Sequence, residues 1–176
     1  MNRISKYSVE EPIAEIAFNV LHDVDLRKTV GLTRCPFART ADDVAAVFED
    51  MAQLDGDALV ACAVDEKLRI VRWSLLAVSR ENFSSVRPID ALIGAIRSKA
   101  KGVILIENRR KWLGAPESSD LVLAIEHASR LLGYTLLDHV IIGKDGEIWS
   151  KSRRTISRSQ PQSQQLELAL KQNVRL

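Results

Sequence analysis

In residues 103–120, VILIENRRKWLGAPESSD, a polar segment with several residues that could take part in chemistry follows an apolar run. Its first four residues predict a buried strand, and its closing Ser-Ser-Asp precedes a second apolar run that predicts a helix. α/β folds place functional residues where strands end in polar loops. Glu107 and Asp120 are carboxylates that could bind a hard cation. Arg109 cannot coordinate a metal, because its guanidinium keeps its proton, so we expect it in an ion pair with a carboxylate.

Helices on both sides of this segment must position it. Pro88 predicts the first turn of one helix, which we expect to end at Gly102. Ser118 or Ser119 predicts the cap of the next helix, which closes at Gly133. Both helices have wide apolar stripes, made of Ile89, Leu92, Ile93, Ile96 and Ala100 in the first and of Leu121, Ala124, Ile125, Ala128, Leu131 and Leu132 in the second.

Besides the strand in the polar segment, the remaining periodic segments predict four strands and further helices. Residues 57–65 and 68–78 predict an antiparallel hairpin, and residues 134–143 predict a strand that turns at KDGE into a short strand, IWS. Helices are predicted at 9–22, at 41–53 after a Thr40 cap, and at 162–173. This order predicts the α/β (α+β) class, with a mixed β-sheet flanked by helices.

The composition is that of an ordinary globular protein, with 46% apolar and 27% charged residues among 176. No apolar run approaches the roughly 18 residues of a membrane span, and the first residues lack a signal-peptide core, so we expect a cytoplasmic protein without membrane contact. Cys35 and Cys62 form no CxxC pair. We expect Cys62 to be a small core residue, and Cys35 has no assigned role.

Basic charge is concentrated at the C-terminal end. Residues 151–176 contain six Lys and Arg against one Glu, a net charge of +5, whereas the rest contains 19 basic and 22 acidic residues, a net charge of −3. Such a segment is either a solvated tail or an arm for an acidic partner or nucleic acid. We divide the chain into an N-terminal helical extension (1–39), a central domain (40–152) and a basic Gln/Ser-rich tail (153–176).

From about Thr40 to Ser152 the chain resembles the RadC-type branch of the JAB/MPN (JAMM) family. The motifs that carry the resemblance occur in family order: VDEKLRIV in the hairpin, SSVRPIDALIGAIRSKAKGVILIEN through the central helix and strand, PESSD, and LLGYTLLDHVIIGKDGEIWS. The last motif is the most specific. The resemblance implies a JAB/MPN-like (cytidine-deaminase-like) fold. The resemblance also implies the site of the active family members, where His-x-His and Asp bind a zinc, a Glu acts as general base and a Ser lies near the oxyanion.

The resemblance also implies that most of these functional residues are replaced. Glu107 and Arg109 occupy the two His positions, and Asp120 occupies the third ligand position. Glu117 occupies the Ser position, with Ser118 one place later. We therefore expect a degenerate metal site with no cofactor, in which Arg109 or Arg110 pairs with Glu107 or Asp120. Zinc held by Glu107 and Asp120 is the alternative.

Tryptophan and histidine add further expectations. The base position falls near Trp73 or Ser74, neither of which is a carboxylate, and an indole facing the cleft would fill the space of base and water. Arg110, Lys111 and Trp112 are of residue types enriched in interface hot spots. We expect His139 to be a structural strand residue and His127 to lie at the surface or in packing.

Three functions follow as hypotheses. The leading one is a catalytically inactive RadC/JAB-like domain that acts as a protein-binding or scaffold module, with a protein partner or a second copy of itself and a possible link to DNA repair. The second is a divergent JAMM-type (iso)peptidase or hydrolase that uses Glu107 and Asp120. The third is association with DNA through the basic tail.

Overall fold

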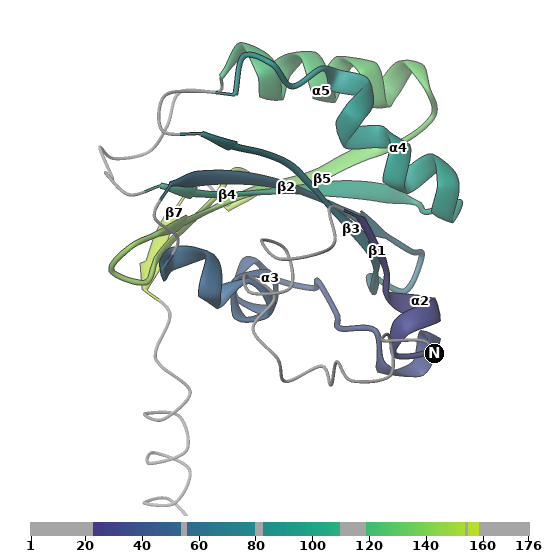
Figure 1. Cartoon of the computed structure of the whole chain (residues 1–176), viewed down its shortest axis with the longest axis horizontal. Coiled ribbons are helices and arrows are strands. Elements are labelled where there is room, and N and C mark those ends of the chain that lie inside the picture. The colour runs from purple at the N-terminus through teal and green to yellow at the C-terminus, as the bar shows by residue number, and fades with distance from the viewer. Residues whose placement is uncertain (1–22, 54–55, 80–82, 110–118, 154, 159–176) are drawn as a thin grey trace, which may run out of the picture.

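The computed structural model describes residues 23–53, 56–79, 83–109, 119–153 and 155–158, arranged around one mixed sheet (Figure 1). The order of its strands is β1-β3-β2-β4-β5-β6-β7. Only β4 and β5 run parallel, and every other neighbouring pair is antiparallel. The predicted mixed sheet with flanking helices is confirmed. The strands are β1 (Asp23–Asp25), β2 (Asp57–Val64), β3 (Ile70–Ser79), β4 (Gly102–Arg109), β5 (Thr135–Gly143), β6 (Glu147–Ser150) and β7 (Thr155–Arg158).

The sheet extends beyond both ends of the predicted central domain. Strand β1 belongs to the segment that we assigned to the N-terminal extension, and it pairs with β3 at one edge. Strand β7 belongs to the segment that we assigned to the tail, and it pairs with β6 at the other edge. Neither strand has enough residues to give a periodic signal in the sequence. The predicted helices at 9–22 and 162–173 lie outside the described residues.

The helix ends follow local capping chemistry. Thr40 and Asp43 form a capping box at the start of α3 (Ala41–Val47). The helix predicted to continue to residue 53 instead breaks at Phe48, and the 3₁₀ helix η3 (Glu49–Gln53) follows. Pro88 begins α4 (Pro88–Ser98) as predicted. Two short elements, α2 (Leu26–Thr29) and the 3₁₀ helix η2 (Leu32–Arg34), precede α3.

Two glycines have different roles in these turns. Helix α4 ends at Lys99, whose φ is 50°, so the prediction that Gly102 ends it is wrong. Gly102 instead begins β4, where a Cβ atom would lie 2.7 Å from the carbonyl oxygen of Thr135. Helix α5 (Asp120–Leu131) is capped by Ser119, which accepts a hydrogen bond from the Val122 amide at 3.3 Å. Gly133 follows α5 with a φ of 76°, as predicted.

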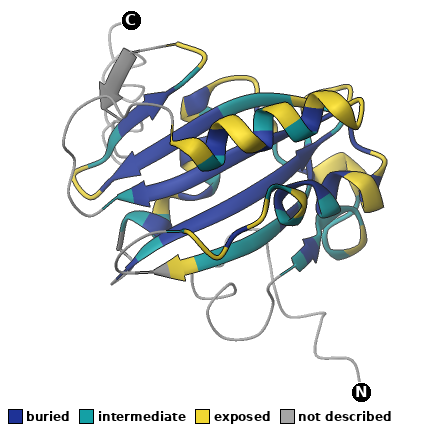
Figure 2. Cartoon of the chain, turned by 90° about the horizontal axis from the view of Figure 1, so that it is seen from above, coloured by how far each residue is buried: buried dark blue, intermediate teal, exposed yellow. Residues whose placement is uncertain are grey.

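Helices cover both faces of the sheet, and two apolar cores result. Helices α4 and α5 lie on one face, and α3 lies on the other (Figure 1). The central strands are buried almost throughout, including β4 as predicted (Figure 2). Cys62 is fully buried in the α3-side core, as expected. In the described ranges, no helix has the length and apolar character needed to cross a membrane.

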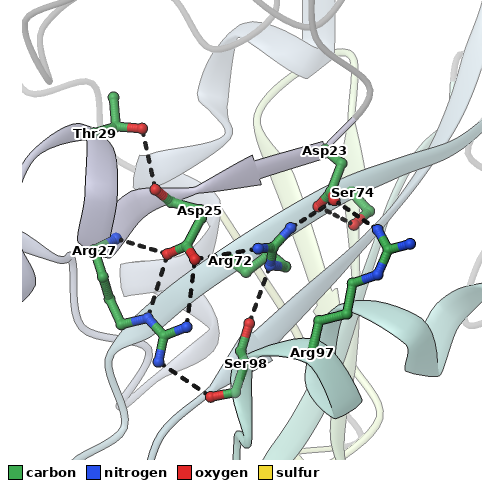
Figure 3. Close-up of polar contacts among 8 residues, drawn as sticks. All are labelled: Asp23, Asp25, Arg27, Thr29, Arg72, Ser74, Arg97 and Ser98. Atoms are coloured by element: carbon green, nitrogen blue, oxygen red, sulfur yellow. Dashed lines mark hydrogen bonds and ion pairs between the residues drawn. The ribbon is translucent and has the colours of Figure 1, made fainter.

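A polar network fastens β1 to β3, α2 and α4 (Figure 3). Arg72 of β3 lies at its centre, where its guanidinium contacts Asp23 at 2.5 Å, Asp25 at 3.1 Å and the Ser98 hydroxyl at 3.1 Å. Arg27 extends the network from Asp25 to the Ser98 carbonyl. Burial raises the pKa of the Asp25 carboxyl, but the hydrogen bonds from Arg27 and the charges of Arg27 and Arg72 outweigh it, so that the pKa lies below its ordinary value.

Candidate functional site

The carboxyl end of β4 carries the first candidate residue, Glu107. Alternate β4 residues Val103 and Leu105 belong to the core beneath α4 and α5, whereas Ile104 and Ile106 belong to the opposite core. Because side chains alternate along a strand, Glu107 points to the α4/α5 face. It is only 6% exposed. A carboxylate this far from water requires partners.

Both oxygens of Glu107 have such partners. Arg109 Nε donates to Oε1 at 2.5 Å, and His139 Nε2 lies 3.1 Å from Oε2. In the Nε2–H tautomer His139 donates this second hydrogen bond. Of the ion pairs that the sequence left open, the one between Arg109 and Glu107 is therefore present. Among the described residues, Asp120 forms no ion pair, and Arg110 lies outside them.

His139 reaches Glu107 because β4 and β5 are parallel. Leu105 is in register with His139, so Glu107 is the next residue on the same face. The His139 ring also packs edge-on against Trp149 of β6, with ring centroids 5.8 Å apart. His139 is buried. The site is thus a Glu–His–Arg cluster, in which Glu107 and His139 are buried and Arg109 is half-buried, bordered by an indole.

The charge of Glu107 is stabilised by this arrangement. Burial raises the pKa of the carboxyl, but the hydrogen bonds and charges of His139 and Arg109 outweigh it, so that the pKa lies below its ordinary value of 4.5. Glu107 is therefore an anion at neutral pH. Its role is that of an acceptor within the cluster, because a general base near neutral pH needs a raised pKa.

The neighbouring Asn108 fixes the end of β4 against β2. Its side-chain amide donates to the Gly56 carbonyl at 2.9 Å, and its Oδ1 accepts from the Ala58 amide. Asn108 points to the α3 face and is almost fully buried. This anchoring holds the end of β4 in place beside Glu107 and Arg109.

The metal-binding capacity of the site depends on which atoms remain available. A catalytic zinc takes three protein ligands, which are imidazole, thiolate or carboxylate groups. Arg109 cannot act as one, and both Glu107 oxygens already accept hydrogen bonds. In the part of the chain that the structure describes, no three His, Cys, Asp or Glu side chains are grouped so that they could hold an ion. Asp120 begins α5 and is exposed.

The two residues predicted near the base position do not join Glu107. Trp73 packs in the opposite core, edge-on to Phe48 at 6.3 Å, so its indole does not face Glu107. The reason is strand alternation, because a change of one residue along β3 reverses the face. Ser74 does point to the α4 face, where it donates to Asp23 at 3.0 Å. Strand β2 separates it from β4.

The remaining predicted residues are placed as follows. His127 is exposed, which agrees with the expectation that it lies at the surface. His139 is a buried strand residue as expected, but its contact with Glu107 was missed. Only the register of two buried parallel strands reveals that contact, and no local pattern encodes that register. Glu117, Ser118, Arg110, Lys111 and Trp112 lie outside the described residues.

Comparison with known proteins agrees with this architecture. The model of the RadC-like JAB domain family matches residues 38–156. A UPF0758 protein of Desulforudis audaxviator is 32% identical over 111 residues, covering 61% of this chain and 48% of the relative. A UPF0758 protein of Thermotoga maritima is 29% identical, covering 56% of this chain and 45% of the relative. A UPF0758 protein of Desulforamulus reducens is also 29% identical, covering 71% of this chain and 54% of the relative. The chain spans about half the length of these relatives. Because the family model covers most of the sheet and the helices on both its faces, the chain belongs to the RadC-like JAB domain family.

Proposed function

We propose that this domain is a non-catalytic binding or scaffold module, in which an internal ion pair stands where the family resemblance implies a metal. The observation that supports the proposal is the pair of contacts to Glu107, at 2.5 Å from Arg109 and 3.1 Å from His139. These contacts satisfy both carboxylate oxygens with protein donors. The residues present therefore do not fit a catalytic zinc.

Electrostatics supports the same interpretation. Two opposite unit charges 4 Å apart interact by about 4 kcal/mol at an effective dielectric constant of 20. A dication bound at Glu107 would meet the Arg109 guanidinium at similar range with the opposite sign, so binding would require Arg109 to leave. The buried cluster thus favours the metal-free state. A domain whose catalytic residues are replaced keeps its folded surface, and a protein-binding module needs only that surface.

The test is metal content measured by inductively coupled plasma mass spectrometry after incubation with zinc and removal of free metal. The wild-type protein is expected to retain far less than one zinc per chain. The double variant Glu107→His/Arg109→His recreates a His-x-His pair upstream of Asp120, and it is expected to bind more zinc than the wild type. Adding Asp120→Ala should remove that gain.

Near-stoichiometric zinc in the wild type that is lost in Glu107→Ala or Asp120→Ala would overturn the proposal and favour the metallohydrolase alternative. Glu66→Ala in the β2–β3 turn is the matched control, because Glu66 is an exposed carboxylate away from the cluster. A cleavage assay on an isopeptide-linked conjugate provides the second measurement. Cleavage that requires Glu107 would also contradict the proposal. The DNA hypothesis stays a prediction about the tail, most of which lies outside the described residues.

A further inference from the structure

Helix α4 has more apolar side chains than the core uses. The core takes Leu92 and Ala95, which are fully buried. Ile89 and Ile96, which the sequence places in the same apolar stripe, are instead 40% and 42% exposed, and Ile93 is half-buried. Exposed isoleucines in a helical row are unusual, whereas isolated ones need no explanation.

These three isoleucines form a second apolar row on the outer side of α4. Their spacing of i, i+4 and i+7 places them above one another on one helix surface. The row is about 10 Å long at 1.5 Å per residue. Asp90 and Arg97 flank it, and Arg97 has a 64% exposed side chain. We call these five residues the α4 outer row.

The α4 outer row is complementary to the same row of a second copy that runs antiparallel to it. If a second α4 packs antiparallel with Ile93 opposite Ile93, Ile89 falls opposite Ile96 of the other copy. Asp90 then falls opposite Arg97 of the other copy, because both pairs are centred within half a residue of position 93. Apolar residues meet apolar residues, and each acidic side chain meets a basic one. The same surface used twice in this way is the hallmark of a twofold interface.

We propose that the protein forms a homodimer through the α4 outer row, with the two α4 helices antiparallel about Ile93. Within one copy, Asp90 is held by Arg87 at 2.7 Å, and Arg97 makes a 3.4 Å contact with Asp23. The contact of Arg97 is at the long end for an ion pair and is largely exposed, so this side chain can turn to the Asp90 of a second copy. This inference does not depend on the proposed function, and metal content does not test it.

Helix α5 supplies the additional area that a stable dimer needs. Each partner in a stable interface contributes roughly 800 Å², more than one helix of this length offers. Helix α5 lies beside α4 on the same face of the sheet (Figure 1). Helix α5 and its C-cap residue expose Leu123, Leu131 and Leu132, with Leu131 at 74%. We expect part of this leucine surface to be covered together with the α4 outer row.

Cysteine cross-linking tests both the interface and its direction. The native Cys35 and Cys62 are buried, so they do not compete for mild oxidants. Ile93→Cys should form a disulfide-linked dimer rapidly, because position 93 meets itself. A mixture of Ile89→Cys and Ile96→Cys chains should link at least about fivefold faster than either variant alone. Leu32→Cys is the matched control, because Leu32 is 43% exposed but lies in η2.

Mass measured by light scattering across a dilution series tests the charge pairing. The wild type should shift from dimer to monomer on dilution. Arg97→Glu should raise the dissociation constant about tenfold, because two ion pairs become two repulsive pairs, whereas Arg97→Lys should stay within about threefold. A wild type that is monomeric at about 100 μM, or Ile89→Cys chains that link with themselves as fast as in the mixture, would overturn the proposal.

Discussion

Separating Arg109 from Glu107 is the perturbation that examines the candidate site most directly. Glu107→Gln keeps the shape of the side chain and leaves an amide oxygen that His139 can still contact. Arg109→Gln removes the guanidinium and leaves a carboxylate that is only 8% exposed, with His139 as its remaining partner. The double variant with Gln at both positions completes a double-mutant cycle, which isolates the coupling between the two charges.

The expected coupling follows from the geometry. A hydrogen bond to a charged group contributes about 1.5–3 kcal/mol to stability. The side chain of Arg109 is 32% exposed and keeps part of its hydration in the folded protein, so the lower end of this range applies. We expect a coupling free energy of about 1.5 kcal/mol. Arg109→Gln alone should lower the thermal midpoint by roughly 3–6 °C for a chain of this size.

Urea unfolding followed by tryptophan fluorescence provides the measurement, because Trp73 and Trp149 are buried in the two faces of the sheet. The four proteins should show equal slopes with denaturant, so that differences in midpoint report stability. A coupling free energy below about 0.5 kcal/mol would contradict this expectation. The contact would then be an ordinary surface ion pair, and Arg109 would not act as the substitute for a metal at Glu107.

Three further predictions concern pH, the polar network and the strand start. The difference in unfolding free energy between wild type and Glu107→Gln should be at its full size above pH 4.5 and should shrink as the pH falls through the lowered pKa of Glu107. The reason is that the unfolded chain then binds a proton more readily than the folded one. A difference that grows in acid would contradict this. In Arg72→Met, the amides of residues 23–25 should exchange hydrogen for deuterium faster while those of β6 stay protected, because Arg72 holds both Asp23 and Asp25. Unchanged exchange would show that backbone pairing alone secures β1. Gly102→Ala should cost about 1–3 kcal/mol in urea unfolding, because its Cβ would overlap the Thr135 carbonyl, and a loss below about 0.5 kcal/mol would mean that β5 can shift.

Much of the fold was predictable because its signals are local. The Thr40 cap, Pro88 at the start of α4 and Gly133 after α5 each act within one helical turn, and all three occur as predicted. The end of the helix after Phe48 and the role of Gly102 were predicted wrongly. Both depend on packing, since Phe48 is held by Trp73 across the core and Gly102 is held close to β5.

The sequence alone was enough to predict the alternation of strands and helices, the family resemblance, and an ion pair between an arginine and a carboxylate of this segment, whose partners the structure identifies as Arg109 and Glu107. The tertiary structure alone decided that His139 completes the cluster, that Trp73 faces away from it, and that Ile89 and Ile96 lie outside the core. The physical reason is that register and face are set by contacts between strands distant in sequence. Periodicity shows that a residue belongs to an apolar row, but only packing decides what that row meets.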